Sequence, residues 1–293
     1  MKIKQTQDSA QIRQQQKRLS PLGNIQGKNS VLYQLDDDNV RKRIQTTSDD
    51  KITEKTVQLW KRLKKKDPHG HLFILPDKVY YDEDGNVSAY DMKRFSGKPL
   101  SQLLVAQNSQ LQWKGVIDHI PQLIRALYRM KEVGYHNDFS QLTNLLYDSK
   151  DGFRIIDFDT FDTKPMVFDL DSNTMVEDVP GRNQEGPGYL LLIVQKIFRI
   201  KDSTYFYKKF ISPYKKEITL SNGDTIYQYD LTTDFPTEKK LIDHWTKKMK
   251  PGLSASTKDN GHFVEGLIAV IMMATAAIGG GILTFVYSRK RHH

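Results

Sequence analysis

Residues 134–162 read GYHNDFSQLTNLLYDSKDGFRIIDFDTFD and combine polar side chains with two short apolar runs. The runs at 145–147 and 153–156 flank an Asp-Gly pair, a strong turn signal, so we predict a β-hairpin. Asn144 would open its first strand and Asp157 would follow its second strand. Because the strands of a hairpin run antiparallel, we expect these two side chains to lie at the same edge.

Asp138 supplies a third polar side chain, in the loop between a long predicted helix and this hairpin. Phosphoryl transfer needs a carboxylate that orients the attacking hydroxyl and accepts its proton. It also needs an amide and a second carboxylate that hold the Mg²⁺ ion, which neutralises the phosphates. The combination of Asp138, Asn144 and Asp157 therefore predicts a phosphotransfer site.

The segment resembles the protein-kinase superfamily, whose catalytic loop reads His-Arg-Asp followed by Asn and whose metal loop reads Asp-Phe-Gly. Residues 136–138, His-Asn-Asp, stand at the first motif, and residues 157–159, Asp-Phe-Asp, stand at the second. The Asn that follows lies six residues after the catalytic-loop Asp instead of five. Ser140 stands where protein kinases usually carry Lys, and Asp159 replaces the Gly of the metal loop.

The resemblance implies a two-lobed α+β fold of the protein-kinase type, which transfers the γ-phosphoryl group of ATP to a hydroxyl of a protein or small-molecule acceptor. In this hypothesis Asp138 orients the acceptor hydroxyl and is catalytic. Asn144 and Asp157 bind Mg²⁺, and Asp159 adds a metal contact. The alternative is a pseudokinase, an inactive binding or scaffold module, to which the departures from the motif point. The intact set of two carboxylates and an amide favours the enzyme.

Residues 21–95 combine short alternating strands with one helix, as expected of the smaller lobe of a kinase. By resemblance, Gly27 and Ser30 stand in the loop that covers the phosphates, and Lys42 holds the α and β phosphates. Glu54, in the helix that follows, is the candidate partner that forms an ion pair with Lys42. Taken alone, these residues also fit a plain hairpin, a surface lysine and a solvated helix carboxylate.

Residues 96–249 would form the larger lobe, which is reduced because the chain has no Ala-Pro-Glu motif and no standard peptide-docking region. The elements that we expect along both lobes are a helix at 47–66, strands at 72–75, 79–81 and 87–92, a hinge at 92–95, helices at 113–133, 189–200, 205–214 and 238–249, and a hairpin at 218–231.

The two ends of the chain differ from this central part. Residues 1–20 are polar and rich in Gln, which predicts a disordered arm. Residues 266–288 carry no charge and suffice to cross the roughly 30 Å core of a bilayer as a helix. We therefore predict a linker at 250–265, a transmembrane helix at 266–288 and a basic tail at 289–293. The helix would anchor the chain in a membrane, with the kinase-like domain in the cytosol. A buried soluble helix is the alternative for the apolar segment.

The composition limits the partners. The chain has 44 Lys and Arg against 35 Asp and Glu, and the net charge of +9 favours anionic partners. Cysteine is absent, which excludes disulfides, thiol catalysis and thiolate metal sites. The sequence carries no aromatic-rich basic platform and no nucleic-acid-binding motif, so we expect no nucleic acid. The predicted partners are a nucleotide with Mg²⁺, a membrane and an unidentified acceptor.

Overall fold

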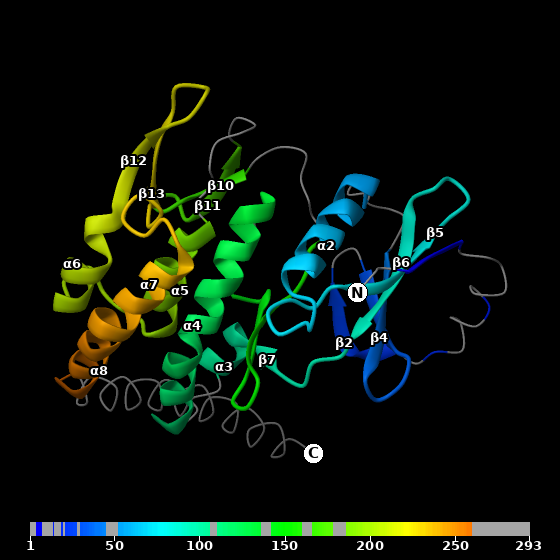
Figure 1. Cartoon of the computed structure of the whole chain (residues 1–293), viewed down its shortest axis with the longest axis horizontal. Helices are drawn as coiled ribbons and strands as arrows, with labels where there is room; N and C mark the ends of the chain where they lie inside the picture. The colour runs from blue at the N-terminus through cyan, green and yellow to red at the C-terminus, as the bar shows by residue number, and fades with distance from the viewer. Residues whose placement is uncertain are drawn as a thin grey trace, which may run out of the picture. The chain divides into compact units, whose positions relative to one another are not determined.

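The structure of the chain, a computed structural model, describes residues 4–7, 14, 19, 21–27, 30–44, 52–105, 110–135, 142–159, 166–177 and 186–259. The chain divides into two compact units, Met1–Asp243 and His244–His293. Strands, mostly paired antiparallel, and helices together make up the first unit (Figure 1). The α+β class that the resemblance implied is therefore confirmed, as helices combined with largely antiparallel sheets.

A six-stranded sheet occupies the N-terminal part of the first unit, with strand order β1-β5-β6-β4-β3-β2. Strand β1 pairs parallel to β5, and every other neighbouring pair in this sheet is antiparallel. The prediction that residues 1–20 are disordered is wrong for β1, because its backbone adds to the open edge of β5. The strands are β1 (Lys4–Gln7), β2 (Pro21–Gly27), β3 (Ser30–Gln34), β4 (Asn39–Ile44), β5 (Pro76–Tyr81) and β6 (Val87–Lys93).

The two faces of this sheet receive alternate side chains of β4, since successive residues of a strand point to opposite sides. Lys42 lies opposite Tyr90 in the register of β4 and β6, and Arg41 lies opposite Asp91. The ring of Trp60 in helix α2 lies 5.2 Å from the Tyr90 ring, between centroids. Lys42 therefore belongs to the face that α2 covers, and Arg41 belongs to the other face.

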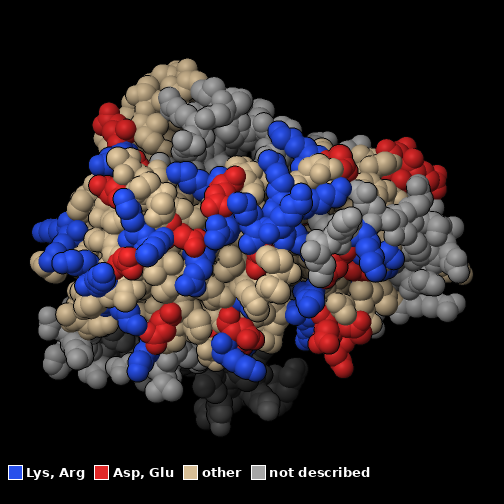
Figure 2. All heavy atoms as spheres, viewed as in Figure 1, with Lys and Arg blue, Asp and Glu red and all other residues tan. Residues whose placement is uncertain are grey.

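Helix α2 spans Glu54–Lys66, and its buried side chains recur at the helical period. Among the described residues of the helix predicted at 47–66, the structure starts the helix only at Glu54, after Thr53 as N-cap. Lys64 is buried, and its ammonium donates to the Pro76 carbonyl at 2.8 Å and to Asp77 at 2.5 Å. Basic side chains complement the C-terminal end of the helix dipole. Figure 2 shows Lys and Arg gathered over the region of α2.

The segment after α2 connects the sheet to the rest of the first unit. Strand 72–75 was expected there, but Phe73 forms only an isolated parallel bridge with Ile155. Two backbone hydrogen bonds of 3.0 Å, from Ile74 N to Ile155 O and from Ile155 N to Leu72 O, accompany the bridge. This pairing places strand β9, and the residues that follow it, beside the chain that leaves α2.

A long helix and a small sheet follow. Helix α4 (Gln110–Val133) confirms the amphipathic helix predicted at 113–133, and Pro121 lies inside it. The predicted hairpin is confirmed by β8 (Leu145–Asp148) and β9 (Gly152–Ile155), which pair antiparallel. The short strand β7 (Lys98–Pro99) joins β8, and helix α3 (Leu100–Val105) comes next in the chain after β7.

The remaining described elements of the first unit build its C-terminal half. Helix α5 is apolar on most of its surface and largely buried, and the hairpin β12–β13 confirms the hairpin expected at 218–231. These elements are β10 (Met166–Asp169), β11 (Thr174–Glu177), η1 (Gly186–Gly188), α5 (Tyr189–Ile197), α6 (Tyr205–Phe210), η2 (Ser212–Tyr214), β12 (Lys215–Thr219), β13 (Thr225–Tyr229) and α7 (Glu238–His244).

The described part of the second unit is helical. It contains the π-helical turn η3 (Trp245–Met249) and helix α8 (Lys250–Asp259). The linker expected at 250–265 is therefore a helix over its first ten residues. Among the residues that the structure describes, no helix is both long and apolar enough to cross a membrane. The segment 266–288, for which we predicted a transmembrane helix, lies outside the described residues.

Candidate functional site

Lys42 of β4 reaches a pair of carboxylates that lie more than a hundred residues further along the chain. Its Nζ atom lies 2.7 Å from Asp157 Oδ1 and 2.5 Å from Asp159 Oδ2. The Lys42 side chain is 12% exposed, so most of its length is packed within the fold. Three residues that we singled out from two separate parts of the sequence therefore meet at one point.

The segment that carries both carboxylates is fixed by the side chain between them. Phe158 is buried, and its ring contacts Phe73 edge-on at 5.6 Å and Tyr135 at 4.8 Å. The indole N–H of Trp60 donates to the Phe158 carbonyl at 2.9 Å. Asp157 has a φ of 63°, in the left-handed region that a non-glycine residue seldom adopts. Helix α2 and the Phe158 ring together hold the carboxylates against Lys42.

Asp159 has a second donor besides Lys42. The Tyr90 hydroxyl donates to Asp159 Oδ1 at 2.5 Å, while Lys42 contacts Oδ2. The hydroxyl of Tyr135 donates to the backbone carbonyl of Asp157 at 3.4 Å. Each carboxylate oxygen of Asp159 thus has a donor from a different strand of the sheet.

The electrostatics of this group follow from burial and close charges. Burial alone would lower the pKa of Lys42, but Asp159 and Asp157 outweigh it and raise that pKa above its usual value. Burial raises the pKa of Asp159, and the charge of Asp157 acts in the same direction, against the lowering effect of Lys42. Burial and the same two carboxylates raise the pKa of Tyr90, so its hydroxyl stays protonated and donates. One ammonium is therefore shared between two carboxylates.

Asn144 lies next to Asp157 in the hairpin. Its backbone carbonyl accepts a hydrogen bond of 3.0 Å from Ile156 N, directly beyond the pairing of β8 with β9. The hairpin thus places Asn144 beside the residue that directly precedes Asp157, as expected from the sequence. Asp138 lies outside the described residues, together with His136 and Asn137. Among the described residues, no group of three or more His, Cys, Asp or Glu side chains could hold a metal ion.

Glu54 does not take the position that the resemblance implied. The expected ion pair of Glu54 with Lys42, both described residues, is not formed. Instead, its carboxylate accepts hydrogen bonds from Gln58 at 2.5 Å and from the Tyr81 hydroxyl at 3.3 Å, and lies 3.7 Å from Lys61 Nζ. The reason is its place in the chain, because α2 begins at Glu54 and leaves its side chain 56% exposed.

Gly27 and Ser30 lie opposite each other, at the end of β2 and the start of β3. Ser30 is buried and also lies opposite Ile44 at the end of β4. The two residues between them lie outside the described part of the chain. Ser30, which the resemblance assigns to the loop over the phosphates, thus lies beside the end of the strand that carries Lys42.

Tyr90 and Trp60 are two residues of the site that were not predicted from the sequence. Tyr90 could have been noticed as an inward residue of an alternating strand, but its register opposite Lys42 depends on how β4 and β6 pair. Trp60 lies on the buried side of its helix. Its bond to the Phe158 carbonyl joins segments 98 residues apart and leaves no local signal.

Comparisons with known proteins give little further information. The chain matches no family model and no curated protein. Among solved structures, it is similar to that of an apo pseudokinase, with 12% sequence identity and a TM-score of 0.34. The match covers 47% of this chain and 56% of the pseudokinase, so the chain spans about half the length of that neighbour.

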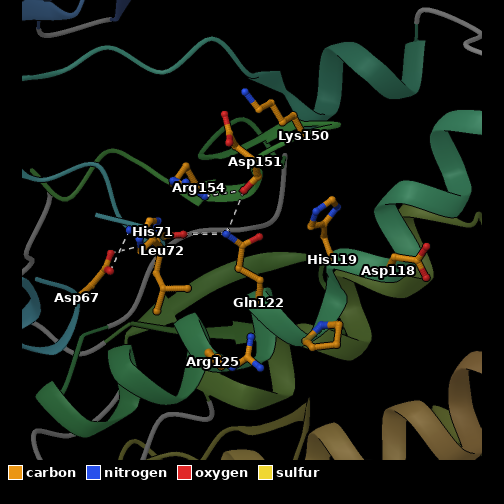
Figure 3. A pocket seen from close by; sticks show the side chains of 11 residues that line it. Asp67, His71, Leu72, Asp118, His119, Gln122, Arg125, Lys150, Asp151 and Arg154 are labelled. Atoms are coloured by element: carbon orange, nitrogen blue, oxygen red, sulfur yellow. Dashed lines mark hydrogen bonds between the residues drawn. The ribbon is translucent and has the colours of Figure 1, made fainter. Parts of the chain in front are cut away.

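Figure 3 shows a separate cavity of about 540 Å³, lined in part by Asp151 and Arg154. Asp151 directly precedes β9, whereas Asp157 follows it. Gln122 of α4 projects into the cavity between His71 and Asp151. The Gln122 amide donates to the carbonyls of His71 at 2.7 Å and Asp151 at 3.2 Å, and its oxygen accepts from Phe153 N at 2.9 Å. These bonds fix the hairpin turn to α4 and to the segment after α2. The lining carries three arginine or lysine side chains and three aspartates, so it selects neither charge.

Proposed function

We propose that the chain is a kinase-like phosphotransferase, which transfers the γ-phosphoryl group of ATP to a hydroxyl of a protein or small-molecule acceptor. The observation that carries the proposal is the 2.7 Å contact between Lys42 of the small sheet and Asp157 after β9. Phosphoryl transfer by a kinase requires a lysine for the phosphates and a carboxylate for the metal at neighbouring positions. In this proposal Lys42 takes the position of the lysine and Asp157 takes the position of the carboxylate.

The donor groups near Lys42 suit a nucleotide with Mg²⁺. Asp157 is 41% exposed at its side chain, and Asn144 lies beside it in the hairpin. Carboxylate and amide oxygens are the ligands that Mg²⁺ takes in such sites, so Asp157 and Asn144 would hold the ion. When bound, Mg²⁺ would neutralise the charge of the phosphates. In this proposal Lys42 binds the phosphates, the turn from Gly27 to Ser30 covers them, and Asp138 orients the acceptor hydroxyl.

The proposal extends to the fold and the location. The antiparallel sheet with α2 would be the smaller lobe of a kinase-like fold, and the elements from β7 onward would be a reduced larger lobe. Their order along the chain supports this assignment. We further propose that residues 266–288 anchor the chain in a membrane, on the grounds of their length and lack of charge. The kinase-like domain would then face the cytosol.

Thermal unfolding of the full chain with ATP and Mg²⁺ tests the nucleotide site. A ligand present at a hundred times its Kd adds about 2.7 kcal/mol to the folded state, which raises the midpoint by several degrees. We expect this Mg²⁺-dependent rise in the wild type and in Asp171→Ala, which removes an exposed carboxylate on another element. The rise should disappear in Asp157→Ala. A wild type without a rise at millimolar nucleotide contradicts the proposal, as does a rise that persists in Asp157→Ala.

A second candidate function is a pseudokinase that binds nucleotide or a protein without transferring phosphate. The position of Glu54 favours it, because the carboxylate expected beside Lys42 contacts Gln58 and Tyr81 instead. The release of phosphate from radiolabelled ATP, with water as the acceptor, separates the two functions. Turnover that is lost in both Asp138→Ala and Asp157→Ala supports the enzyme. A Mg²⁺-dependent rise in midpoint without any turnover supports the pseudokinase.

A further inference from the structure

We propose that Asp159 and Tyr90 position Lys42 for the nucleotide, in the place that a glutamate of the helix takes in kinases. Asp159 is then a positioning residue and not a metal ligand. The inference rests on the proposed function for its consequence, since a positioned lysine matters only if Lys42 binds phosphate. The contact itself is a property of the fold and can be tested without nucleotide.

The first argument is the occupancy of the two Asp159 oxygens. Oδ2 lies 2.5 Å from Lys42 Nζ, and Oδ1 accepts the Tyr90 hydroxyl at 2.5 Å. A metal ion would have to share an oxygen with one of these donors, on a carboxylate whose side chain is only 14% exposed. Charge-assisted hydrogen bonds of this length are the stronger kind in proteins. The Asp159 carboxylate is therefore committed to the sheet.

The second argument is the difference between the two carboxylates. Asp157 shares Lys42 with Asp159, but its side chain is 41% exposed against 14% for Asp159. The more exposed carboxylate is the one that can turn toward a metal without leaving a buried charge unpaired. Lys42 would keep its contact with Asp159 in that event. Asp157 is therefore the acid that can bind a ligand, and Asp159 is the acid that stays in contact with Lys42.

The third argument is the position of the competing carboxylate. Glu54 is engaged by Gln58 and Tyr81 and is more than half exposed. Trp60, two turns further along α2, instead bonds to the Phe158 carbonyl. Helix α2 therefore acts on Lys42 through the segment that carries Asp159, and not through a carboxylate of its own.

The chain contains a matched control for this arrangement. Arg41, the neighbour of Lys42, contacts Asp91 at 2.5 Å and the Tyr80 hydroxyl at 2.5 Å on the opposite face of the sheet. Tyr80 in turn donates to Asp91 at 2.7 Å. Like the group of Lys42, Asp159 and Tyr90, this second network combines a cation, an aspartate and a tyrosine hydroxyl.

A double-mutant cycle on the full chain without nucleotide tests the contact. We expect Lys42→Met and Asp159→Asn to be coupled by about tenfold in the unfolding equilibrium constant, because contacting residues couple and distant ones add. The cycle of Lys42→Met with Glu54→Gln should show less than about twofold coupling. The control cycle combines Lys42→Met with Asp91→Asn, because Asp91 belongs to the buried ion pair on the other face of the sheet. Coupling of Lys42 with Glu54 that equals or exceeds its coupling with Asp159 overturns the proposal.

Nucleotide binding tests the consequence. We expect Tyr90→Phe and Asp159→Asn to weaken ATP binding by about tenfold at saturating Mg²⁺. The Mg²⁺ concentration at which ATP binding is half-maximal should stay unchanged. The control Tyr80→Phe should leave ATP binding within about twofold of the wild type. A Mg²⁺ requirement that rises in Asp159→Asn shows a metal ligand and overturns the positioning role. If the wild type binds no nucleotide, the proposed function fails, whereas the mutant cycle still decides whether Asp159 holds Lys42.

Discussion

Trp60 is the side chain through which helix α2 holds the candidate site, and its replacement by Phe has a calculable cost. The indole is fully buried, and its N–H donates to the Phe158 carbonyl at 2.9 Å. Trp60→Phe leaves that carbonyl without its donor, which costs about 1–3 kcal/mol. The smaller ring also loses buried apolar atoms, at about 0.8 kcal/mol for each methylene equivalent. We therefore expect the free energy of unfolding to fall by roughly 2–4 kcal/mol.

Urea unfolding of the full chain, followed by circular dichroism, measures this loss. The midpoint should fall while the slope stays constant, because the surface exposed on unfolding barely changes. Tyr205→Phe is the control: this aromatic side chain is 65% exposed, so its substitution should change stability by no more than about 0.5 kcal/mol. A Trp60→Phe loss as small as that of Tyr205→Phe would refute the role of the indole. The same variant should weaken nucleotide binding, since Phe158 lies between the two carboxylates on Lys42.

Three further predictions concern the frame of the site. Gly152 and Gly85 have φ of 77° and 79°, but of the two only Gly152 would bring an added Cβ against Gln122 Oε1. Gly152→Ala should therefore destabilise the fold by about 1–2 kcal/mol more than Gly85→Ala in urea unfolding, and equal losses would contradict the fixing role of Gln122. Lys64→Met should lower the free energy of unfolding by roughly 1–3 kcal/mol, because the partly exposed Asp77 loses its partner, and a change below about 0.5 kcal/mol would contradict it. Although burial would raise the pKa of Asp169, hydrogen bonds from neighbouring groups lower it. The contribution of Asp169 to stability is therefore present above the unfolded pKa near 3.8 and is lost as the pH falls through the folded pKa. Between pH 6 and pH 3, the urea midpoint of Asp169→Asn should fall less than that of the wild type, and an equal fall in both would contradict this.

Local patterns in the sequence were sufficient for the elements around the candidate site. The Asp-Gly turn between two apolar runs correctly predicted the hairpin of β8 and β9, because turn type and strand length are local properties. The spacing of apolar residues likewise predicted α4, and the structure places Pro121 in its interior. Local patterns did not predict β1, since polar residues such as those of Lys4–Gln7 form a strand only when an open sheet edge accepts them.

The partners of Lys42 show where such prediction ends. From the sequence, two carboxylates close to each other and a third in the helix were candidates, and the resemblance pointed to the one in the helix as the partner of Lys42. The structure instead joins Lys42 to Asp157 and Asp159. The choice depends on where α2 begins, because a helix that starts at Glu54 leaves this side chain at its exposed first turn. It also depends on the register that sets Tyr90 opposite Lys42. Both are tertiary properties that neither spacing nor composition contains.

Two adjacent residues of β4 show why an ion pair alone does not identify a functional site. Arg41 and Lys42 each contact a carboxylate in a network that includes a tyrosine hydroxyl. The difference lies in access, because the Arg41 network consists of strand residues whose carboxylate, Asp91, is 17% exposed. The Lys42 network adds a second carboxylate, Asp157, which is 41% exposed and follows a hairpin with Asn144 beside it. A buried ion pair stabilises or specifies a fold. A buried cation that also contacts an exposed acid can instead exchange that contact for an anionic ligand while it keeps its contact with the buried acid. This asymmetry, and not the presence of the ion pair, is the physical reason to place nucleotide chemistry on the Lys42 face of the sheet.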